Sequence, residues 1–461
     1  MVITTRFSPS PTGSMHLGNV RTALLNWLYA RRYNGRFLLR FEDTDRNRSE
    51  MKHAHSIQED LRWLGLGWDG DALFQSERHT KHWEALEGLV AQDKAYRCFC
   101  SEHQLSLDRK LAASRGLPPR YTGRCRTLSV NESLQQAKNN PFVWRLAVHA
   151  DEGEVRVPDA LRGDVHFGCR DLDDPVVVRS DGSFTFLLPN AVDDAIDGIT
   201  HVLRGDDHLT NSAYQVWLLE HLDLNVPMYF HHGLLLGQDG AKLSKRSGGH
   251  SVAELREDGL LPAALMQTMG RLGYPNLSEV ILKAEELAVC FEAEHISKAS
   301  VRWSDDELWR WHTHLLHGLS TEDLAALIQP FFPDTDKQCL QAFASLIGPN
   351  LNRVEDAKGF KRLLDASAEM DEAAMRILEE TGPDFFKEAG DIWSKMDEPD
   401  WQAWTKSVKA KTGCKGKALF LPLRVALTGA SSGPQMNQVI AFLGKEGTGT
   451  HLDDSIRRLS L

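Results

Sequence analysis

Two stretches of the sequence contain side chains suited to phosphate chemistry. Residues 8–19 (SPSPTGSMHLGN) are rich in Ser, Pro and Gly and contain His16. Residues 241–249 (AKLSKRSGG) contain the cations Lys242, Lys245 and Arg246. A ring N–H and several cations can hold a triphosphate and stabilise the charge that develops as one of its bonds breaks. Each stretch alone also has a simpler interpretation, since His16 can cap its own helix and a basic loop can be a solvated surface.

The elements expected around residues 8–19 favour the phosphate interpretation. Residues 2–7 (VITTRF) predict a buried strand, and residues 36–43 (RFLLRFED) predict a second one. Between them the apolar residues recur every three or four positions up to Gly35, which indicates a helix: Val20, Ala23, Leu24, Trp27 and Leu28. This is a βαβ unit, so residues 8–19 lie where unpaired N–H groups and the helix dipole attract an anion.

The α/β pattern is interrupted and then returns. Residues 87–190 are mixed, basic and Pro-containing, which indicates an inserted domain. A strand, a helix and a strand are then expected over 197–205, 212–222 and 228–236, just before the basic loop. After about residue 250 we expect almost only helices, with amphipathic runs at 308–316 and 354–364.

Composition limits the class of protein. The chain has 461 residues, of which 42% are hydrophobic, enough for about three to five modules. Neither a signal peptide nor a long apolar segment is evident, so we expect a cytosolic protein without a membrane segment. The net charge of −11 excludes coating of nucleic acid by the overall field. Local contact with RNA remains open, because positive charge gathers in three ranges: 109–126, 242–246 and 406–424.

Three of the seven cysteines are close together in the sequence. Cys98 and Cys100 are followed by Cys125, while the other four stand apart. Three thiolates and one oxygen or nitrogen can complete a tetrahedral zinc site, for which Tyr121 is the first candidate as fourth ligand and His103 the second. The alternative is three reduced cysteines in a metal-free subdomain.

The pair of basic and His-bearing motifs resembles the paired signatures of class I aminoacyl-tRNA synthetases. Within that class, four segments resemble the glutamyl-tRNA synthetases in the same order: residues 5–24, 39–49, 199–211 and 242–248. Weaker similarity continues through residues 422–429. The resemblance implies an α/β protein whose Rossmann-type parallel sheet is interrupted by an α+β insertion and followed by all-helical anticodon-binding domains. The expected divisions are 1–86 and 191–240 for the catalytic domain, 87–190 for the acceptor-binding insertion, 241–320 for a stem-contact domain and 321–461 for the anticodon-binding region.

The resemblance also implies an ATP-dependent ligation of L-glutamate to the 3′ end of tRNA(Glu), through glutamyl-adenylate and with Mg²⁺ sharing the phosphate charge. The catalytic residues implied are His16, Lys242 and Lys245. ATP is expected to contact His16, Gly18, Asn19, Lys242, Leu243, Ser244, Lys245 and Arg246. Glutamate is expected to contact Arg6, Ser8, Glu42, Phe186, Asn190 and Arg204. The zinc ligands expected are Cys98, Cys100, Tyr121 and Cys125, and the enzyme is expected to be a monomer.

Four positions depart from the family pattern. Asn19 stands where class I enzymes have a second His, which leaves one catalytic His. Phe186 stands where the family commonly has a Tyr beside the glutamate. In a rough alignment Asn350 stands where some discriminating members have an Arg, so charging of tRNA(Gln) is an alternative. Thr127 stands where some members have a fourth zinc ligand, a His.

Other classes of protein fit the sequence less well. A nucleotidyltransferase would have no use for the long helical region. A truncated relative that glutamylates a modified tRNA base would end near residue 300. An inactive RNA-binding relative would not need His16, Glu42, Arg204 and Lys245, which are all present.

Overall fold

The computed structural model describes residues 2–45, 49–116, 118–243, 249–274, 280, 282–396 and 400–460. The chain forms two compact units, residues 1–257 with 265–305, and residues 258–264 with 306–461. The five parts expected from the sequence remain a prediction. Within the described residues, no helix is long and apolar enough to cross a membrane.

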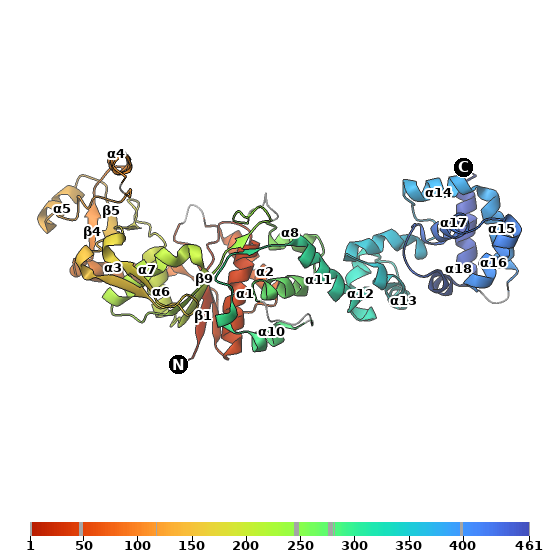
Figure 1. The fold of residues 1–461 in the computed structure, drawn as a ribbon, viewed down its shortest axis with the longest axis horizontal. Coiled ribbons are helices and arrows are strands. Elements are labelled where there is room, and N and C mark those ends of the chain that lie inside the picture. The colour runs from red at the N-terminus through yellow and green to blue at the C-terminus, as the bar shows by residue number, and fades with distance from the viewer. Residues whose placement is uncertain are drawn as a thin grey trace. The chain divides into compact units, whose positions relative to one another are not determined.

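The first unit is built on a parallel sheet. Its strands are β1 (Thr4–Phe7), β2 (Arg36–Phe41), β3 (Leu73–Phe74), β9 (His201–Gly205) and β10 (Met228–His232). β1, β2 and β3 pair in that order, and β9 pairs with β10. β1 lies beside β9 (Figure 1), where the amide of Thr200 donates to the carbonyl of Thr4 at 2.9 Å. The expected parallel sheet is therefore present, and its two halves come from distant parts of the sequence.

The predicted βαβ unit is confirmed. α1 (Leu17–Arg32) connects β1 to β2, and its five predicted apolar residues are buried. Gly35 ends the connection where a Cβ would lie 2.3 Å from the carbonyl oxygen of Ile3, so only glycine fits there. The turn after β1 thus leads directly into the N-terminus of a buried helix.

The segment between the two halves of the sheet is α+β. Its strands are β4 (Ala95–Cys98), β5 (Val143–Leu146), β6 (Glu154–Val157), β7 (Val165–Gly168) and β8 (Val176–Val178), all in antiparallel pairs. Its helices α4 (Glu102–Ser114) and α5 (Val130–Ala137) bury no residue of their own. One hydrophobic core contains Trp144 of β5 and Trp217 of the helix after β9, so the insertion packs on the catalytic sheet's own helices.

Further helices belong to the first unit. They are α2 (Met51–Trp63), α3 (His79–Ala91), α6 (Leu187–Ile196), α7 (Leu209–His221), α8 (Val252–Glu257) and α10 (Ala284–Cys290), and α9 (Pro262–Arg271) spans the boundary between the units. The strand expected over 228–236 breaks at Gly233 into β10 and β11 (Leu235–Leu236), and β11 pairs with β12 (Val301–Arg302). A Cβ at Gly233 would lie 2.1 Å from the carbonyl oxygen of Ala299, which explains the glycine at the break.

The second unit is helical over its described residues, as predicted. Its helices are α11 (Asp305–His317), α12 (Thr321–Ile328), α13 (Lys337–Ile347), α14 (Glu372–Thr381), α15 (Pro383–Ser394), α16 (Trp401–Thr412), α17 (Lys417–Thr428) and α18 (Met436–Arg458), whose path breaks at Gly444. They enclose one continuous hydrophobic core. The run at 354–364 forms a 3₁₀ helix, η9 (Val354–Leu363), because its apolar residues repeat every three positions.

Candidate active site

A cavity of about 810 Å³ opens at the carboxyl ends of the parallel strands. The ends of β1, β9 and β10 and the N-terminus of α1 border it, the position where open α/β sheets bind ligands. Among the residues expected to contact substrates, those in its wall are Arg6, Ser8, His16, Gly18, Asn19, Glu42, Phe186, Asn190, Arg204, Lys242 and Leu243. The structure therefore brings together the expected residues that it describes. Ser244, Lys245 and Arg246 lie outside the described residues.

His16 is the N-cap of α1. Its Nδ1 accepts a hydrogen bond from the amide of Asn19 at 3.3 Å, and the Asn19 side chain accepts from the amide of His16 at 3.4 Å. An accepting Nδ1 places the proton of a neutral ring on Nε2. Burial and the charge of Lys242 lower the pKa of His16, which favours the neutral ring. Capping thus fixes the tautomer that presents an N–H donor to a phosphate.

Lys242 forms an ion pair across the cavity mouth. Its Nζ lies 2.9 Å from Oδ2 of Asp207, which follows β9. The next residue, Leu243, donates its amide to the carbonyl of Leu235 at 3.1 Å. The start of the basic loop is therefore anchored to the sheet beside the cavity.

Arg6 is buried and held by a carboxylate. Asp194 accepts from Nε of Arg6 at 3.0 Å and from Nη2 at 3.2 Å. Asp194 also accepts from Arg40 at 2.6 Å, and these two cations keep the pKa of Asp194 low against the effect of its burial. Among the described residues no acceptor is recorded for Nη1 of Arg6, so this donor is the one left for a ligand.

A chain of amides connects Glu42 to Arg204. The amide nitrogen of Asn190 donates to Glu42, and the amide oxygen of Asn190 accepts from Gln215 at 2.7 Å. Gln215 in turn accepts from Nη2 of Arg204 at 2.6 Å. Burial raises the pKa of Glu42 to about 7, opposed by Arg40 and Arg6. The carboxylate and the guanidinium thus lie in one wall, held by neutral groups.

Arg204 is buried without a carboxylate partner among the described residues. Its described hydrogen bonds go to Ser212, Gln215 and His231. Burial lowers its pKa to about 10, so it remains charged near neutral pH. A buried cation with only neutral partners favours an incoming anion.

Ser8 and Phe186 complete the wall. The hydroxyl of Ser8 is buried and has no hydrogen-bond partner among the described residues. Phe186 precedes α6, with its ring centroid 5.6 Å from that of His208. A phenylalanine supplies shape here but no hydrogen bond, whereas Ser8 has an unsatisfied donor and acceptor for a ligand.

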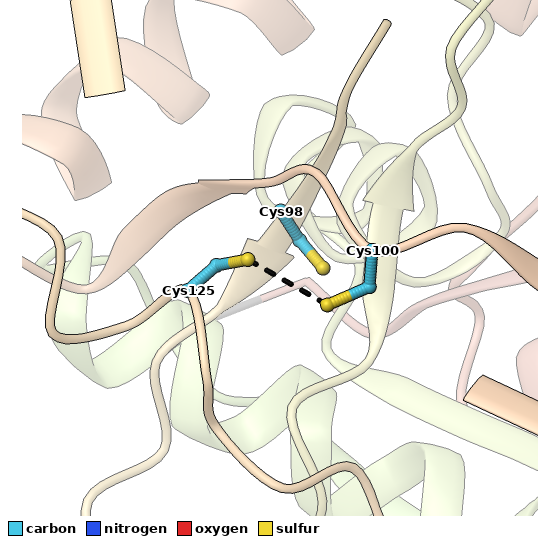
Figure 2. Close-up of side chains that lie close together, drawn as sticks. All are labelled: Cys98, Cys100 and Cys125. Carbon is cyan, nitrogen blue, oxygen red and sulfur yellow. Dashed lines mark hydrogen bonds between the residues drawn. The ribbon is translucent and has the colours of Figure 1, made fainter. Parts of the chain in front are cut away.

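The three clustered cysteines meet in the insertion (Figure 2). The sulfur atoms of Cys98, Cys100 and Cys125 all lie within 4.8 Å of one another. The hydroxyl of Tyr121 lies 3.3 Å from the Cys98 sulfur and 3.6 Å from the Cys100 sulfur. His103, the second candidate for a fourth ligand, is not part of this group among the described residues. Three thiols and a phenol oxygen at these distances fit a tetrahedral metal site.

Sequence reasoning missed the residues that hold the expected ones in place: Asp159, Asp194, Asp207, Ser212, Gln215 and His231. Asp194 lies in the acidic run VDDAID and Asp207 in RGDDH, and acids beside buried arginines were an available signal. Ser212, Gln215 and His231 carried no such signal, because they occur in ordinary helix and strand patterns.

Comparisons with known proteins show the family to which the chain belongs. The family described as "tRNA synthetases class I (E and Q), catalytic domain" matches residues 2–310, and the "Anticodon binding domain" family matches residues 323–456. "Glutamate--tRNA ligase 1" of Halorhodospira halophila is 40% identical over 97% of this chain and 95% of its own length. "Glutamate--tRNA ligase 2" of Coxiella burnetii is 39% identical over 98% of this chain and 99% of its own.

A solved structure is also similar over its full length. It is described as a glutamate tRNA ligase from Elizabethkingia meningosepticum in complex with its amino acid, with a TM-score of 0.86, 27% identity and 100% coverage of both chains. The two family matches, which together cover most of the chain, show a class I aminoacyl-tRNA synthetase. The chain belongs, within this class, to the glutamate–tRNA ligase family.

Proposed function

We propose that the chain joins L-glutamate to the 3′ end of tRNA(Glu) at the expense of ATP. The glutamate α-carboxylate attacks the α-phosphorus of ATP, which releases pyrophosphate and forms glutamyl-adenylate. The terminal ribose of the tRNA then takes the acyl group and AMP leaves. The proposal rests on one observation: a single cavity is lined by Arg6, Arg204, Glu42 and the turn that contains His16.

The proposed glutamate site matches the charges of the substrate. Glutamate has two carboxylates and one ammonium group, and the cavity presents Arg6, Arg204 and Glu42. We assign the side-chain carboxylate to Arg6, the α-carboxylate to Arg204 and the ammonium to Glu42. Ser8 and Asn190 supply neutral hydrogen bonds, and Phe186 supplies shape.

The proposed ATP site lies over the N-terminus of α1. The Nε2–H of His16 donates to a phosphate, and the backbone at Gly18 and Asn19 lets the phosphates approach the helix. Lys242, Leu243, Ser244, Lys245 and Arg246 are assigned to ATP as well, with Lys245 binding the departing pyrophosphate and Mg²⁺ sharing its charge. Catalysis is mainly positioning and electrostatic stabilisation, since no covalent enzyme intermediate is required.

The insertion is proposed to hold zinc through Cys98, Cys100, Cys125 and Tyr121. Zinc supplies structural stability there, because four protein ligands leave no open position for a substrate. The zinc site would order the segment that connects β4 to the basic range 109–126. We propose that this basic range binds the acceptor end of the tRNA.

The second unit is proposed to read the anticodon. A cavity of about 570 Å³ is lined by Trp401, Phe420 and Arg424, among others. Aromatic faces can stack on unpaired bases, and a guanidinium can bind base edges. Asn350, at the end of η8 (Gly348–Asn350), is exposed and assigned to the third anticodon base. A neutral side chain discriminates less than arginine there, so the proposal includes some charging of tRNA(Gln).

The proposal also includes a monomeric enzyme in the cytosol. All seven cysteines are free, which agrees with a reducing compartment. The direct test of the function is charging of purified tRNA(Glu) and tRNA(Gln) transcripts with labelled glutamate and ATP. Charging of tRNA(Glu) is expected to be the faster reaction, and no charging of either tRNA would overturn the proposal.

A further inference from the structure

Behind Arg204 lies a buried chain of three polar side chains that substrate binding does not explain. Oδ2 of Asp159 lies 2.5 Å from Nδ1 of His231, and Nε2 of His231 lies 2.6 Å from the hydroxyl of Ser212. That hydroxyl accepts from Nη2 of Arg204 at 2.5 Å. All these groups are almost fully buried, so the chain is isolated from solvent.

The direction of each hydrogen bond follows from the donors present. Oδ1 of Asp159 accepts from the amides of Leu161 and Arg162, both at 2.8 Å, and Oδ2 accepts from the amide of His231 at 3.1 Å. Burial alone would raise the pKa of Asp159, but these bonds and the one from the His231 ring hold it low. Asp159 is thus an ionised acceptor, and Nδ1 of His231 carries the ring proton.

Nε2 of His231 is consequently an acceptor. It accepts a hydrogen bond from the Ser212 hydroxyl at 2.6 Å, a shorter distance than the 3.2 Å from this hydroxyl to its other acceptor, the carbonyl of His208. The lone pairs of the hydroxyl then face Nη2 of Arg204. Nε of Arg204 also lies 3.4 Å from Nε2. Two of the three guanidinium nitrogens of Arg204, Nε and Nη2, therefore contact this chain of side chains. The third, Nη1, has no acceptor among the described residues. The opposite tautomer would place an N–H on Nε2, facing the N–H of Arg204.

We propose that Asp159, His231 and Ser212 are positioning residues that orient Arg204 toward the α-carboxylate of glutamate. Asp159 fixes the tautomer of His231, His231 fixes the hydroxyl of Ser212, and Ser212 fixes the guanidinium. Asp159 comes from the insertion and is joined to β10, where the amide of Ala160 donates to the carbonyl of Tyr229 at 2.9 Å. The insertion thus contributes to the amino acid site.

The inference rests on the proposed role of Arg204, so Arg204→Ala is measured first. It is expected to raise the KM for glutamate in tRNA(Glu) charging, and an unchanged glutamate KM would remove both that role and this inference. Asp159→Asn and Ser212→Ala are then compared. Both are expected to raise the glutamate KM by about tenfold or more and to leave the ATP KM within about twofold, since hydrogen bonds to a charged group are lost or misdirected.

Two controls separate positioning from simple structural support. Ser212→Thr keeps the hydroxyl and is expected to retain most of the glutamate affinity. Asp193 and His82, 3.0 Å apart, form a second buried carboxylate–histidine pair, which has no contact with Arg204 among the described residues. Asp193→Asn is therefore expected to leave the glutamate KM unchanged. The ¹⁵N shifts of the His231 ring should report a proton on Nδ1 in the native enzyme and on Nε2 in Asp159→Asn. A strong effect of Arg204→Ala with a normal glutamate KM in Asp159→Asn and Ser212→Ala would overturn the inference.

Discussion

Asp194 binds the Nε–Nη2 edge of the Arg6 guanidinium, and Nη1 has no acceptor among the residues that the structure describes. The same carboxylate is bound by Arg40, so it keeps a cation when Arg6 is removed. Arg6→Ala should therefore fold, while the glutamate KM rises by about tenfold to a hundredfold, the cost of one charge-assisted hydrogen bond. The ATP KM should change little. Steady-state charging kinetics check this, with Arg31→Ala, which removes a partly exposed pair with Asp69, as control. A normal glutamate KM would require another cation for the side-chain carboxylate.

Glu42 predicts a pH dependence of glutamate binding. Its pKa is raised to about 7 by burial, and only the ionised carboxylate pairs with an ammonium group. As pH falls through 7 Glu42 becomes protonated, so the glutamate KM should rise by about tenfold between pH 8 and pH 6. Glu42→Gln should have a high glutamate KM that varies little over this range. A steep dependence that persists in Glu42→Gln would assign the titration to another group.

Substitutions can separate the N-cap that His16 provides for α1 from the phosphate contact that we propose for it. His16→Asn keeps a side-chain acceptor for the cap of α1 but removes the Nε2–H donor, so stability should be nearly unchanged. Its rate of adenylate formation should fall by about 10²–10³-fold, as for loss of a donor to a developing charge. His16→Ala should show the same loss and about 1 kcal/mol less stability. Single-turnover kinetics and thermal unfolding measure the two effects, and a normal rate for His16→Asn would leave His16 with the cap alone.

The cysteine cluster predicts a metal content. Protein purified without added zinc should contain about one zinc per chain, and Cys98→Ser should lose it. Cys169→Ser is a matched control, because Cys169 is also a buried free cysteine but lies outside the group. Elemental analysis measures the zinc content of the native, Cys98→Ser and Cys169→Ser proteins. A fully active native enzyme without metal would favour three reduced thiols.

Asn350 predicts incomplete discrimination between two tRNAs. Asn350→Arg should suppress charging of tRNA(Gln) more than that of tRNA(Glu), because a planar bidentate cation reads a base edge more selectively. Asn352→Arg adds the same charge at another exposed position nearby and should not change the ratio. The ratio of kcat/KM for the two transcripts is the measurement. If the native enzyme charges tRNA(Glu) alone, discrimination rests on other residues.

Local sequence patterns predicted most helices and strands. The partners of the site residues and the breaks in the elements depend on contacts between distant parts of the chain. The run before Gly35 has a helical period, and the structure confirms α1 there. The partners of Arg6 could not be foreseen in the same way, because Asp194 is 188 residues away and no local spacing joins them. The amphipathic run at 354–364 predicted a helix, and the structure forms a 3₁₀ helix over Val354–Leu363. Gly233 breaks a predicted strand only because the backbone of Ala299 approaches it.

The pairing of Thr4 with Thr200 spans 196 positions of the chain. A ribosome that adds about 5–20 residues per second needs roughly ten to forty seconds to produce the second partner after the first. During this interval the edge of β1 that β9 will cover lacks its neighbour, and such edges invite pairing with other chains. Nascent chains of this enzyme should therefore depend on chaperones until the second half of the sheet has emerged, although the finished protein has no such edge at β1.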